Sequence, residues 1–250
     1  MYEIYNEDCI EGMKKITDGS VDAIICDPPY QSTDCAWDVR LPLEEMWLEF
    51  KRVTKENGAI VLFSQLPFAV DLINANRKMF RYEYVWFKSK ACGFLNANRM
   101  PLRAHENILV FYRRLPTYNP QFKKGKAYTR SHEFRKAGVY QSSRGNITVN
   151  DGEHYYPRDV LQINSINGNS KKEPRYHLTQ KPVELMEFLV KTYTNEWETV
   201  LDATMGSGST GVAAINTNRR FIGFETDKNF CDIAGRRIAE AVALKEQSLL

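Results

Sequence analysis

The sequence predicts an α/β fold in which helices cover both faces of a mostly parallel sheet. Short apolar runs alternate with segments of helical periodicity along the 250 residues. This alternation is typical of parallel sheets whose strands are joined by helices. Hydrophobic residues make up 43% of the chain, which is enough to bury a core. The length suits one sizeable α/β domain that carries an insertion.

The expected strands are runs rich in Val, Ile, Phe and Tyr that are bounded mostly by polar or turn-forming residues. Such runs occur at residues 2–5, 21–26, 59–63, 82–87, 108–112, 200–203 and 221–224. We therefore expect a seven-stranded sheet. One of its strands should be antiparallel and lie near an edge.

Helices are expected at 43–54, 182–195, 209–216 and 227–244. The first, second and fourth repeat apolar residues at the three- and four-residue spacing of a helix face. Pro42 and Pro182 stand where a helix begins, a position that favours proline. The third helix follows a glycine-rich turn. All of these apolar faces should pack on the sheet.

Composition excludes several classes of protein. No run approaches the ~20 apolar residues of a membrane span, and the polar N-terminal segment lacks the apolar core of a signal peptide. The five cysteines form no Cys-x-x-Cys pair, so neither a disulfide framework nor a zinc site is predicted. We expect a cytoplasmic protein that needs no metal.

Charge is concentrated in one part of the chain. Residues 112–176 hold 13 Lys or Arg and five acids, an excess of +8 in a chain whose net charge is +3. The stretch from 115 to 175 is polar and shows little periodicity, and a loop of that length is unusual unless it is functional. It is predicted to bind a polyanion; the alternative is a solvated charged loop.

A first candidate site is Asp27-Pro28-Pro29-Tyr30, which directly follows the strand at 21–26. Ligands of open α/β sheets bind beyond the carboxyl ends of the strands. The Asp27 carboxylate and the Pro28 carbonyl are suited to accept both hydrogens of an aromatic amino group and to stabilise positive charge on its nitrogen. Tyr30 offers a flat face to an unstacked base. The alternative is a structural turn with a packed tyrosine.

A second candidate site is the glycine-rich stretch 202–211, where an apolar strand runs into a small-residue turn and then a helix. Gly206, Gly208 and Gly211 match the G-x-G-x-x-G dinucleotide fingerprint, because glycine lets the backbone approach a ligand closely. Glu225 ends the next strand, where a carboxylate can accept hydrogen bonds from two ribose hydroxyls. The pattern fits any adenosine cofactor, so a nicotinamide oxidoreductase stays open here.

A third candidate site is His177-Leu178-Thr179-Gln180-Lys181-Pro182, just ahead of the helix at 182–195. The N–H groups of a helix start and the Lys181 ammonium favour a carboxylate, such as the charged tail of a cofactor. The alternative is a plain helix start capped by Thr179 or Gln180.

Together the three motifs resemble the β class of S-adenosylmethionine-dependent amino-methyltransferases of bacterial and phage DNA. That class places D-P-P-Y near the N-terminus, Asp-x-x-x-Gly-x-Gly near the C-terminus, and a target-recognition segment between them. The sequence H-x-T-Q-K-P ahead of the glycine loop is specific to this family. The same order occurs here, and the resemblance covers nearly the whole chain. One departure is that Ala203, Thr204 and Met205 replace a stretch that usually contains phenylalanine.

The resemblance implies a Rossmann-like class I methyltransferase fold in three parts. Residues 1–114 would form the catalytic half, 115–176 the target-recognition insertion, and 177–250 the half that binds S-adenosylmethionine. It implies that Asp27, Pro28, Pro29 and Tyr30 are catalytic. It also implies cofactor contacts for a larger set of residues, namely Asp8, Cys9, Thr179, Lys181, Asp202, Thr204, Gly206, Ser207, Gly208, Ser209, Thr210 and Glu225.

Within this set, the resemblance assigns each group to a part of the cofactor. Asp8 and Cys9 would contact the adenine and Glu225 the ribose. Thr179 and Lys181 would lie near the methionine carboxylate. The stretch Arg103-Ala104-His105-Glu106 resembles one that often lies near the target base.

The function expected from the resemblance is methylation of adenine N6 in double-stranded DNA after base flipping. Asp before Pro-Pro-Tyr goes mostly with adenine in this family and Ser mostly with cytosine N4, so N4-cytosine methylation is the alternative. A non-catalytic DNA-binding subunit is the alternative from another class. The resemblance also implies a homodimer and a cognate restriction enzyme, in a bacterial or phage-encoded system. The loop 31–40, which contains Trp37, is a candidate to close over the flipped base.

Overall fold

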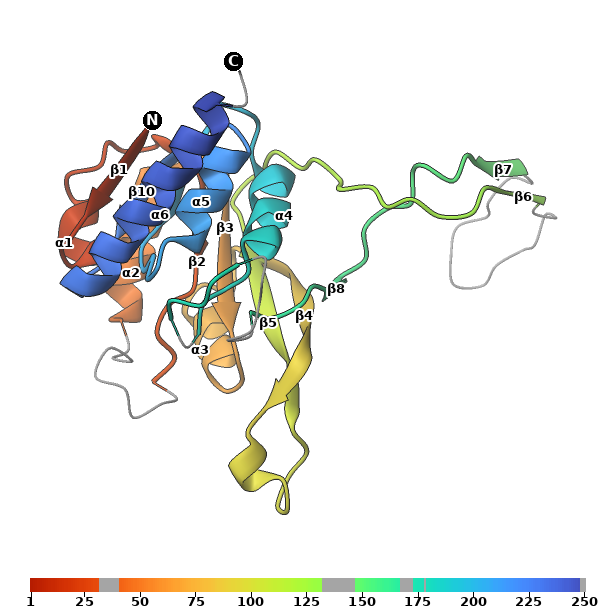
Figure 1. Cartoon of the computed structure of the whole chain (residues 1–250), viewed down its shortest axis with the longest axis horizontal. Helices are drawn as coiled ribbons and strands as arrows, with labels where there is room; N and C mark the ends of the chain where they lie inside the picture. The colour runs from red at the N-terminus through yellow and green to blue at the C-terminus, as the bar shows by residue number, and fades with distance from the viewer. Residues whose placement is uncertain (32–40, 132–146, 167–172, 178, 248–250) are drawn as a thin grey trace. The chain divides into compact units, whose positions relative to one another are not determined.

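An eight-stranded sheet forms the centre of the larger of two compact units (Figure 1). The computed structural model describes residues 1–31, 41–131, 147–166, 173–177 and 179–247. The larger unit comprises Met1–Asn119 and Asp159–Leu250, and the smaller unit is Pro120–Arg158. Most of the predicted closing loop 31–40, with Trp37, lies outside the described residues, as does part of the basic insertion.

The sheet is parallel except around one strand. Its spatial order is β1 (Tyr2–Tyr5), β10 (Arg220–Phe224), β9 (Thr199–Asp202), β2 (Val21–Cys26), β3 (Thr54–Ser64), β5 (Arg103–Phe111), β4 (Phe80–Cys92) and β8 (Val160–Gln162). Only β5 runs antiparallel to both of its neighbours, β3 and β4. This confirms the mostly parallel sheet with one antiparallel strand, which lies third from the β8 edge.

All seven predicted strands are present, but the predicted number was wrong because the sheet has an eighth. Strand β8 pairs in parallel with β4 over three residues, Val85↔Val160 to Phe87↔Gln162. Of its three side chains only Leu161 is buried. A strand this short has too few alternating positions to be distinguished from a loop.

The helices cover both faces of the sheet, as predicted. They are α1 (Cys9–Met13), α2 (Leu43–Val53), α3 (Phe68–Ala75), α4 (Val183–Tyr193), α5 (Ser209–Asn216) and α6 (Lys228–Gln247). The four predicted helices are confirmed to within three residues at each end. Helices α1 and α3 were missed, because five and eight residues give little periodicity. Among the described residues, no helix is long and apolar enough to cross a membrane.

Alternation along the central strand β2 sends side chains to two separate cores. Ile24 packs with α1, α2 and α3 on one face, whereas Ala23 and Ile25 pack with α4 on the other. A third cluster joins α5 and α6 to β10. Because both faces are covered, the open edge at the carboxyl ends of the strands is where the fold can hold a ligand.

Strands β4 and β5 are longer than their apolar runs predict. The predicted strands end at Phe87 and begin at Ile108, but the observed ones reach Cys92 and start at Arg103. The additional residues form a hairpin that extends beyond the sheet, drawn yellow in Figure 1. A short 3₁₀ helix, η1 (Phe94–Asn96), lies at its tip.

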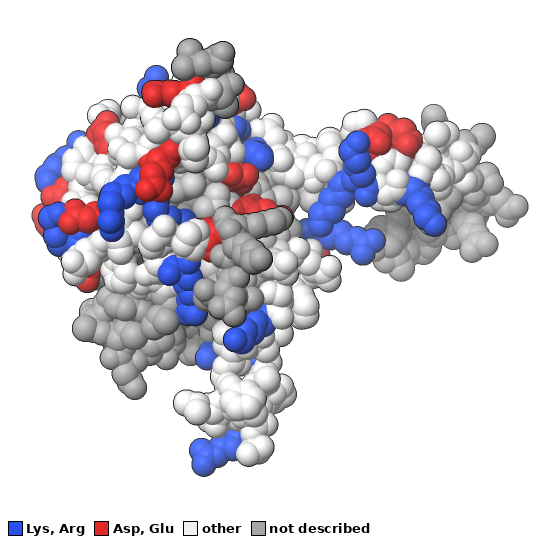
Figure 2. Space-filling view, viewed as in Figure 1, with Lys and Arg blue, Asp and Glu red and all other residues white. Residues whose placement is uncertain are grey.

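The smaller unit is built on a two-stranded antiparallel ribbon of β6 (Tyr128–Ser131) and β7 (Ile147–Asn150). An isolated bridge between Lys123 and Tyr155 joins its two ends. This unit lies inside the predicted insertion 115–176, whose later part contributes β8 to the main sheet. Lys and Arg side chains lie along its surface (Figure 2).

Candidate active site

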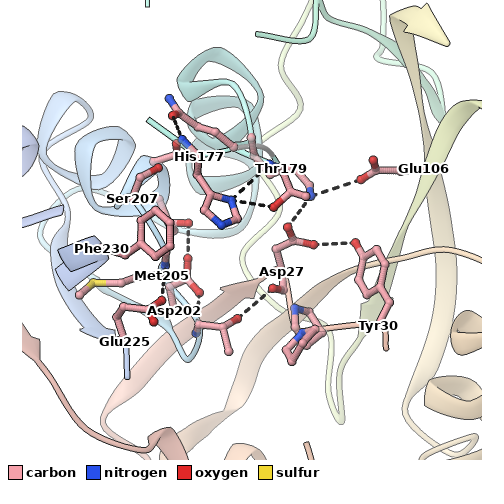
Figure 3. Close-up of a pocket in the computed structure, with 18 of the residues that line it drawn as sticks. Asp27, Tyr30, Glu106, His177, Thr179, Asp202, Met205, Ser207, Glu225 and Phe230 are labelled. Carbon is pink, nitrogen blue, oxygen red and sulfur yellow. Dashed lines mark hydrogen bonds and ion pairs between the residues drawn. The ribbon is translucent and has the colours of Figure 1, made fainter. Parts of the chain in front are cut away.

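One pocket of about 960 Å³ collects the three sequence motifs at the carboxyl ends of β2, β9 and β10. Parallel pairing of β2 with β9, Ile24 opposite Leu201, brings the segments that follow the two strands side by side. Every predicted catalytic and cofactor-binding residue lines this pocket except Gly208. Motifs about 175 positions apart in the sequence therefore share one cavity, shown in Figure 3.

The glycine loop 202–211 is held by two carboxylates. Asp202 accepts hydrogen bonds from the Thr204 backbone N–H, at 3.1 Å, and from the Thr210 hydroxyl. Glu225 accepts one from the Gly206 N–H at 3.0 Å. Gly206 has φ +51° and open space where a Cβ would stand, so its backbone faces the cavity directly.

Gly208 has a packing role. With φ +81°, it occupies a conformation that favours glycine, and a Cβ there would meet the Cβ of Ala234 at 2.8 Å. Gly208 therefore lets the loop lie against α6 while its neighbours face the cavity.

Sequence reasoning missed a partly buried ion pair that supports this loop. Arg237 of α6 donates to the Ser207 carbonyl at 2.6 Å and pairs with Glu173 at 2.9 Å. The Glu173 carboxylate also accepts the Val183 N–H at the start of α4. A signal was available, because Arg237 stands in the apolar stripe of α6 beside Ile238.

The N-terminal pair, Asp8 and Cys9, lies at the start of α1. Asp8 caps this helix by accepting the N–H groups of Ile10, at 2.9 Å, and Glu11, at 3.2 Å. Burial raises the pKa of the Cys9 thiol to about 12, so the thiol stays protonated and unreactive at neutral pH. Both residues line the cavity.

In the D-P-P-Y loop, residues 27–30, both carboxylate oxygens and the backbone carbonyl of Asp27 accept hydrogen bonds. The Tyr30 hydroxyl donates to Asp27 Oδ1 at 2.6 Å, and Lys181 Nζ donates to Oδ2. The Thr204 hydroxyl donates to the Asp27 backbone carbonyl at 2.9 Å. The Tyr30 ring packs against Phe68, 5.4 Å between centroids. These contacts hold Asp27 in place and tie the D-P-P-Y loop directly to the glycine loop.

Lys181 belongs to a chain of four charges, three of them buried, that the sequence did not predict. Figure 3 labels two of the four, Asp27 and Glu106. Its ammonium lies between Asp27 and Glu106, 3.3 Å from Glu106 Oε2. Glu106 Oε1 accepts a hydrogen bond from Lys88 at 2.9 Å. Lys88, Glu106 and Lys181 are all less than 10% exposed. Alternating signs let these charges stay buried at a net charge of zero.

Within this group of four charges, the pKa shifts favour a charged Lys181 beside a more easily protonated Asp27. Burial raises the pKa of Asp27, and the nearby Lys181 offsets this only in part. Burial alone would lower the pKa of Lys181, but Asp27 and Glu106 outweigh it and raise that pKa. Lys181 therefore stays charged. Of the two carboxylates beside it, Asp27 and Glu106, Asp27 is the one that can more easily take up a proton.

The third motif is divided between two environments. Thr179 donates to His177 Nδ1 from its hydroxyl, at 2.9 Å, and from its N–H, at 3.2 Å. The His177 ring meets the edge of Phe230, 4.5 Å between centroids. Lys181, in contrast, contacts Asp27. The motif thus links the wall of the cavity near α6 to the D-P-P-Y loop.

Comparison with known proteins identifies the family. The N6_N4_Mtase model, described as DNA methylase, matches residues 21–236. The chain belongs to this DNA methylase family. The type II methyltransferase M.BglII of Bacillus subtilis is 30% identical over 253 residues, covering 93% of the chain and 67% of that protein. M.HindIII of Haemophilus influenzae is 24% identical, covering 94% of both.

Solved structures of DNA methylases share the fold. The M1.HpyAVI complex with S-adenosylmethionine has a TM-score of 0.65 and 25% identity, covering 95% of the chain and all of that structure. The cytosine-N4-specific PvuII methyltransferase has a TM-score of 0.67, with 16% identity over 97% of the chain and 93% of that structure. The protein is thus an S-adenosylmethionine-dependent DNA methyltransferase with a class I fold.

The cavity fits S-adenosylmethionine on the chemistry of its lining. Besides Asp27 and Glu106, which pair with Lys181, four carboxylates line it, those of Glu7, Asp8, Asp202 and Glu225. Such groups suit ribose hydroxyls and a cationic cofactor. Glu7 Oε1 is buried and has no hydrogen-bond partner among the described residues. The open space at Gly206 leaves room for a ligand against the backbone.

We expect the Asp202 carboxylate to make the affinity for S-adenosylmethionine depend on pH. Burial raises its pKa to about 7, so the carboxylate is partly protonated at neutral pH. A cation binds the ionised form, so we expect affinity for S-adenosylmethionine to rise as the pH passes above about 7, with proton release on binding. Calorimetry in buffers of different ionisation enthalpy measures that release.

The matched variants are Asp202→Asn and Asp232→Asn. Asp202→Asn should remove the proton release, whereas Asp232→Asn, on the exposed side of α6, should leave it unchanged. Equal proton release by Asp202→Asn and the unmodified protein would exclude Asp202 as the titrating group.

Proposed function

We propose that this DNA methyltransferase methylates N6 of adenine in double-stranded DNA, with the base flipped into the cavity beside the D-P-P-Y loop. The observation that carries this proposal is the Asp27 carboxylate, held by Tyr30 and Lys181 at the junction with the glycine loop. Catalytic roles are assigned to Asp27, Pro28, Pro29 and Tyr30. The predicted glycine-loop and N-terminal residues are assigned to the cofactor.

Asp27 and the two prolines would activate the amino group. An exocyclic amino group is a weak nucleophile, because its lone pair is delocalised into the ring. Acceptors aimed at its hydrogens localise that lone pair and stabilise the positive charge that develops. A carboxylate offers about four lone-pair positions, and Tyr30 and Lys181 use two of them. Pro28 and Pro29 have no N–H groups, so the loop presents acceptors to the base.

Lys181 and Glu106 would set the charge state of Asp27. S-adenosylmethionine supplies a methyl group activated by its sulfonium. The amino nitrogen would take that methyl group as the bond from carbon to the sulfonium sulfur breaks, with a neutral thioether as the leaving group. The nitrogen then carries the positive charge and must release one proton. Burial raises the pKa of Asp27, which suits it to accept this proton. Lys181 keeps the carboxylate ionised until then. We therefore assign Lys181 to the positioning of Asp27 and not to the methionine carboxylate.

The choice of adenine rests on Asp27, since Asp at this position of the motif goes mostly with adenine in the family that the sequence resembles. The alternative is N4 of cytosine, because the PvuII methyltransferase, which shares the fold, is cytosine-N4-specific. A non-catalytic DNA-binding subunit is disfavoured, because the motifs assemble into one cavity in which Asp27 is paired with Lys181.

The smaller unit, Pro120–Arg158, is assigned to DNA recognition. Its described surface carries Lys123, Lys124, Lys126 and Arg158, which are suited to phosphates. Phe122 and Tyr156 are exposed on it, 5.1 Å between ring centroids. A homodimer, a cognate restriction enzyme and a bacterial cytoplasmic setting stay predictions from the resemblance.

The proposal is tested by transfer of labelled methyl groups from S-adenosylmethionine to unmethylated double-stranded DNA, followed by mass spectrometry of the nucleosides. N6-methyladenine is expected. N4-methylcytosine would keep the mechanism and overturn the base assignment. No methylated nucleoside, with cofactor bound, would support the non-catalytic alternative.

A further inference from the structure

The hairpin of β4 and β5 ends in an exposed apolar tip. Phe94 is 79% exposed, Leu95 fully exposed and Met100 55% exposed. They stand within one ten-residue turn between Cys92 and Arg103. An isolated exposed apolar side chain is ordinary, but a group of large ones at the end of a projection marks a binding surface.

The projecting part of the hairpin, residues 88–105, carries only positive charge. No Asp or Glu occurs from residue 84 to residue 105, a stretch that holds Lys88, Lys90, Arg99 and Arg103. Figure 2 shows this tip as white side chains with blue Lys or Arg side chains beside them. Lys88 is buried in the charge chain described above, which leaves Lys90, Arg99 and Arg103 exposed. The partner that matches such a surface is a polyanion with apolar faces, which is DNA.

The base of the hairpin forms part of the wall of the active-site cavity. Lys90, Ala91, Cys92 and Arg103 line the same cavity as Asp27. Arg103 also donates to Gln65, at the end of β3, at 2.8 Å. A duplex that delivers one base to Asp27 therefore has to pass along the hairpin. The apolar tip is then presented to the DNA and not to bulk solvent.

We propose that the hairpin tip inserts Phe94 and Leu95 into the duplex beside the target base and stabilises the unstacked DNA. Apolar side chains used in this way fill the space between base steps and compensate for lost stacking. Lys90 and Arg99 would hold the flanking phosphates. The inference rests on the base flipping in the proposed function, and it adds a role for residues outside the three motifs.

The test compares Phe94→Ala/Leu95→Ala with the exposed control Leu244→Ala on α6, which is 68% exposed. Methyl transfer is measured on two duplexes that contain the sequence methylated by the unmodified protein. In one duplex the target base is paired, and in the other it faces an abasic position. Fluorescence of 2-aminopurine at the target site reports flipping directly. Thermal melting and S-adenosylmethionine affinity check folding, which such exposed positions should not alter.

On the paired duplex, the double variant should lose roughly ten- to a hundredfold in kcat/KM together with the 2-aminopurine signal. On the abasic duplex the target base is already unpaired, so the double variant should recover most of this loss. Leu244→Ala should match the unmodified protein on both. Equal loss on both duplexes, or no loss on either, would overturn the inference. Equal loss with a smaller particle in sedimentation would assign the tip to contact between two copies of the chain.

The two proposals fail differently. If the unmodified protein methylates no DNA, the proposed function fails before the hairpin is tested. If it methylates both duplexes and the double variant does so equally well, only the role of the hairpin is lost.

Discussion

Replacing Asp27 by Ala or Asn is expected to reduce methyl transfer by at least about 10³-fold while S-adenosylmethionine still binds. Asp27 is held by Tyr30 and Lys181, and it is the group assigned to polarise the amino nitrogen and take up its proton. Single-turnover transfer to DNA measures the loss, and calorimetry measures cofactor affinity.

The two substitutions separate charge from shape. Asn preserves the size of the side chain and an acceptor for the Tyr30 hydroxyl but removes the carboxylate. If Asn retained activity and Ala lost it, Asp27 would act by geometry alone. Substantial activity in both variants would refute the mechanism. Tyr30→Phe is the milder control, because it removes the hydrogen bond to Asp27 and keeps the ring packed on Phe68.

Lys181→Met is expected to lower the free energy of unfolding by about 3–5 kcal/mol at neutral pH, a loss typical of broken buried ion pairs. It leaves Asp27 and Glu106 side by side without the ammonium between them. Chemical denaturation measures the effect. The control is Lys191→Met, a half-exposed lysine of α4, the helix that follows Lys181. Lys191 pairs with Glu187, and its loss should cost less than about 1 kcal/mol.

The stability lost in Lys181→Met should increase with pH. Burial already raises the pKa of Asp27 above its ordinary value of 3.8, and removal of Lys181 raises it further. The folded state then binds a proton more strongly than the unfolded state, so stability falls as the pH rises above about 4. The double variant Lys181→Met/Glu106→Gln removes one charge of each sign and should recover part of the stability. If Lys181→Met lost the same stability at pH 5 and pH 8, and the double variant recovered none of it, the proposed coupling between Lys181, Asp27 and Glu106 would be contradicted.

The sequence predicted the sheet and the location of the site because both depend on local patterns. Apolar runs such as that of β2 show the strand, and the residue after each run lies at the edge where ligands bind. Asp27 and Asp202 could therefore be expected to approach each other before any coordinates were known. Adjacent strands β2 and β9 bring this about.

The charge chain could not be predicted, because it depends on which side chains meet across strands. Glu106 lies on β5 opposite Trp86 of β4, and nothing in the spacing along the chain shows that Lys181 reaches it. The helix start at Pro182 suggested an anion site for Lys181. The structure supplies the anion from the protein itself, through Asp27.

The projecting part of the hairpin was missed because it lacks a buried apolar pattern. Lys88 is buried but charged, and residues 89–92 are exposed or half-buried, so the apolar pattern ends at Phe87 while the strand continues to Cys92. Strand pairing without burial leaves no hydrophobic signal in the sequence.

The hydroxyl of Thr204 joins the two loops of the site, since it donates to the Asp27 carbonyl and contacts Cys26 Sγ at 3.1 Å. Thr204 is itself fixed by Asp202. A ligand that orders the glycine loop thereby also orders the D-P-P-Y loop. A second ligand that binds the D-P-P-Y loop then has a smaller entropic cost of ordering. Binding of S-adenosylmethionine and binding of the target base should then be cooperative. By reciprocity, DNA should tighten the cofactor by the same factor as the cofactor tightens DNA.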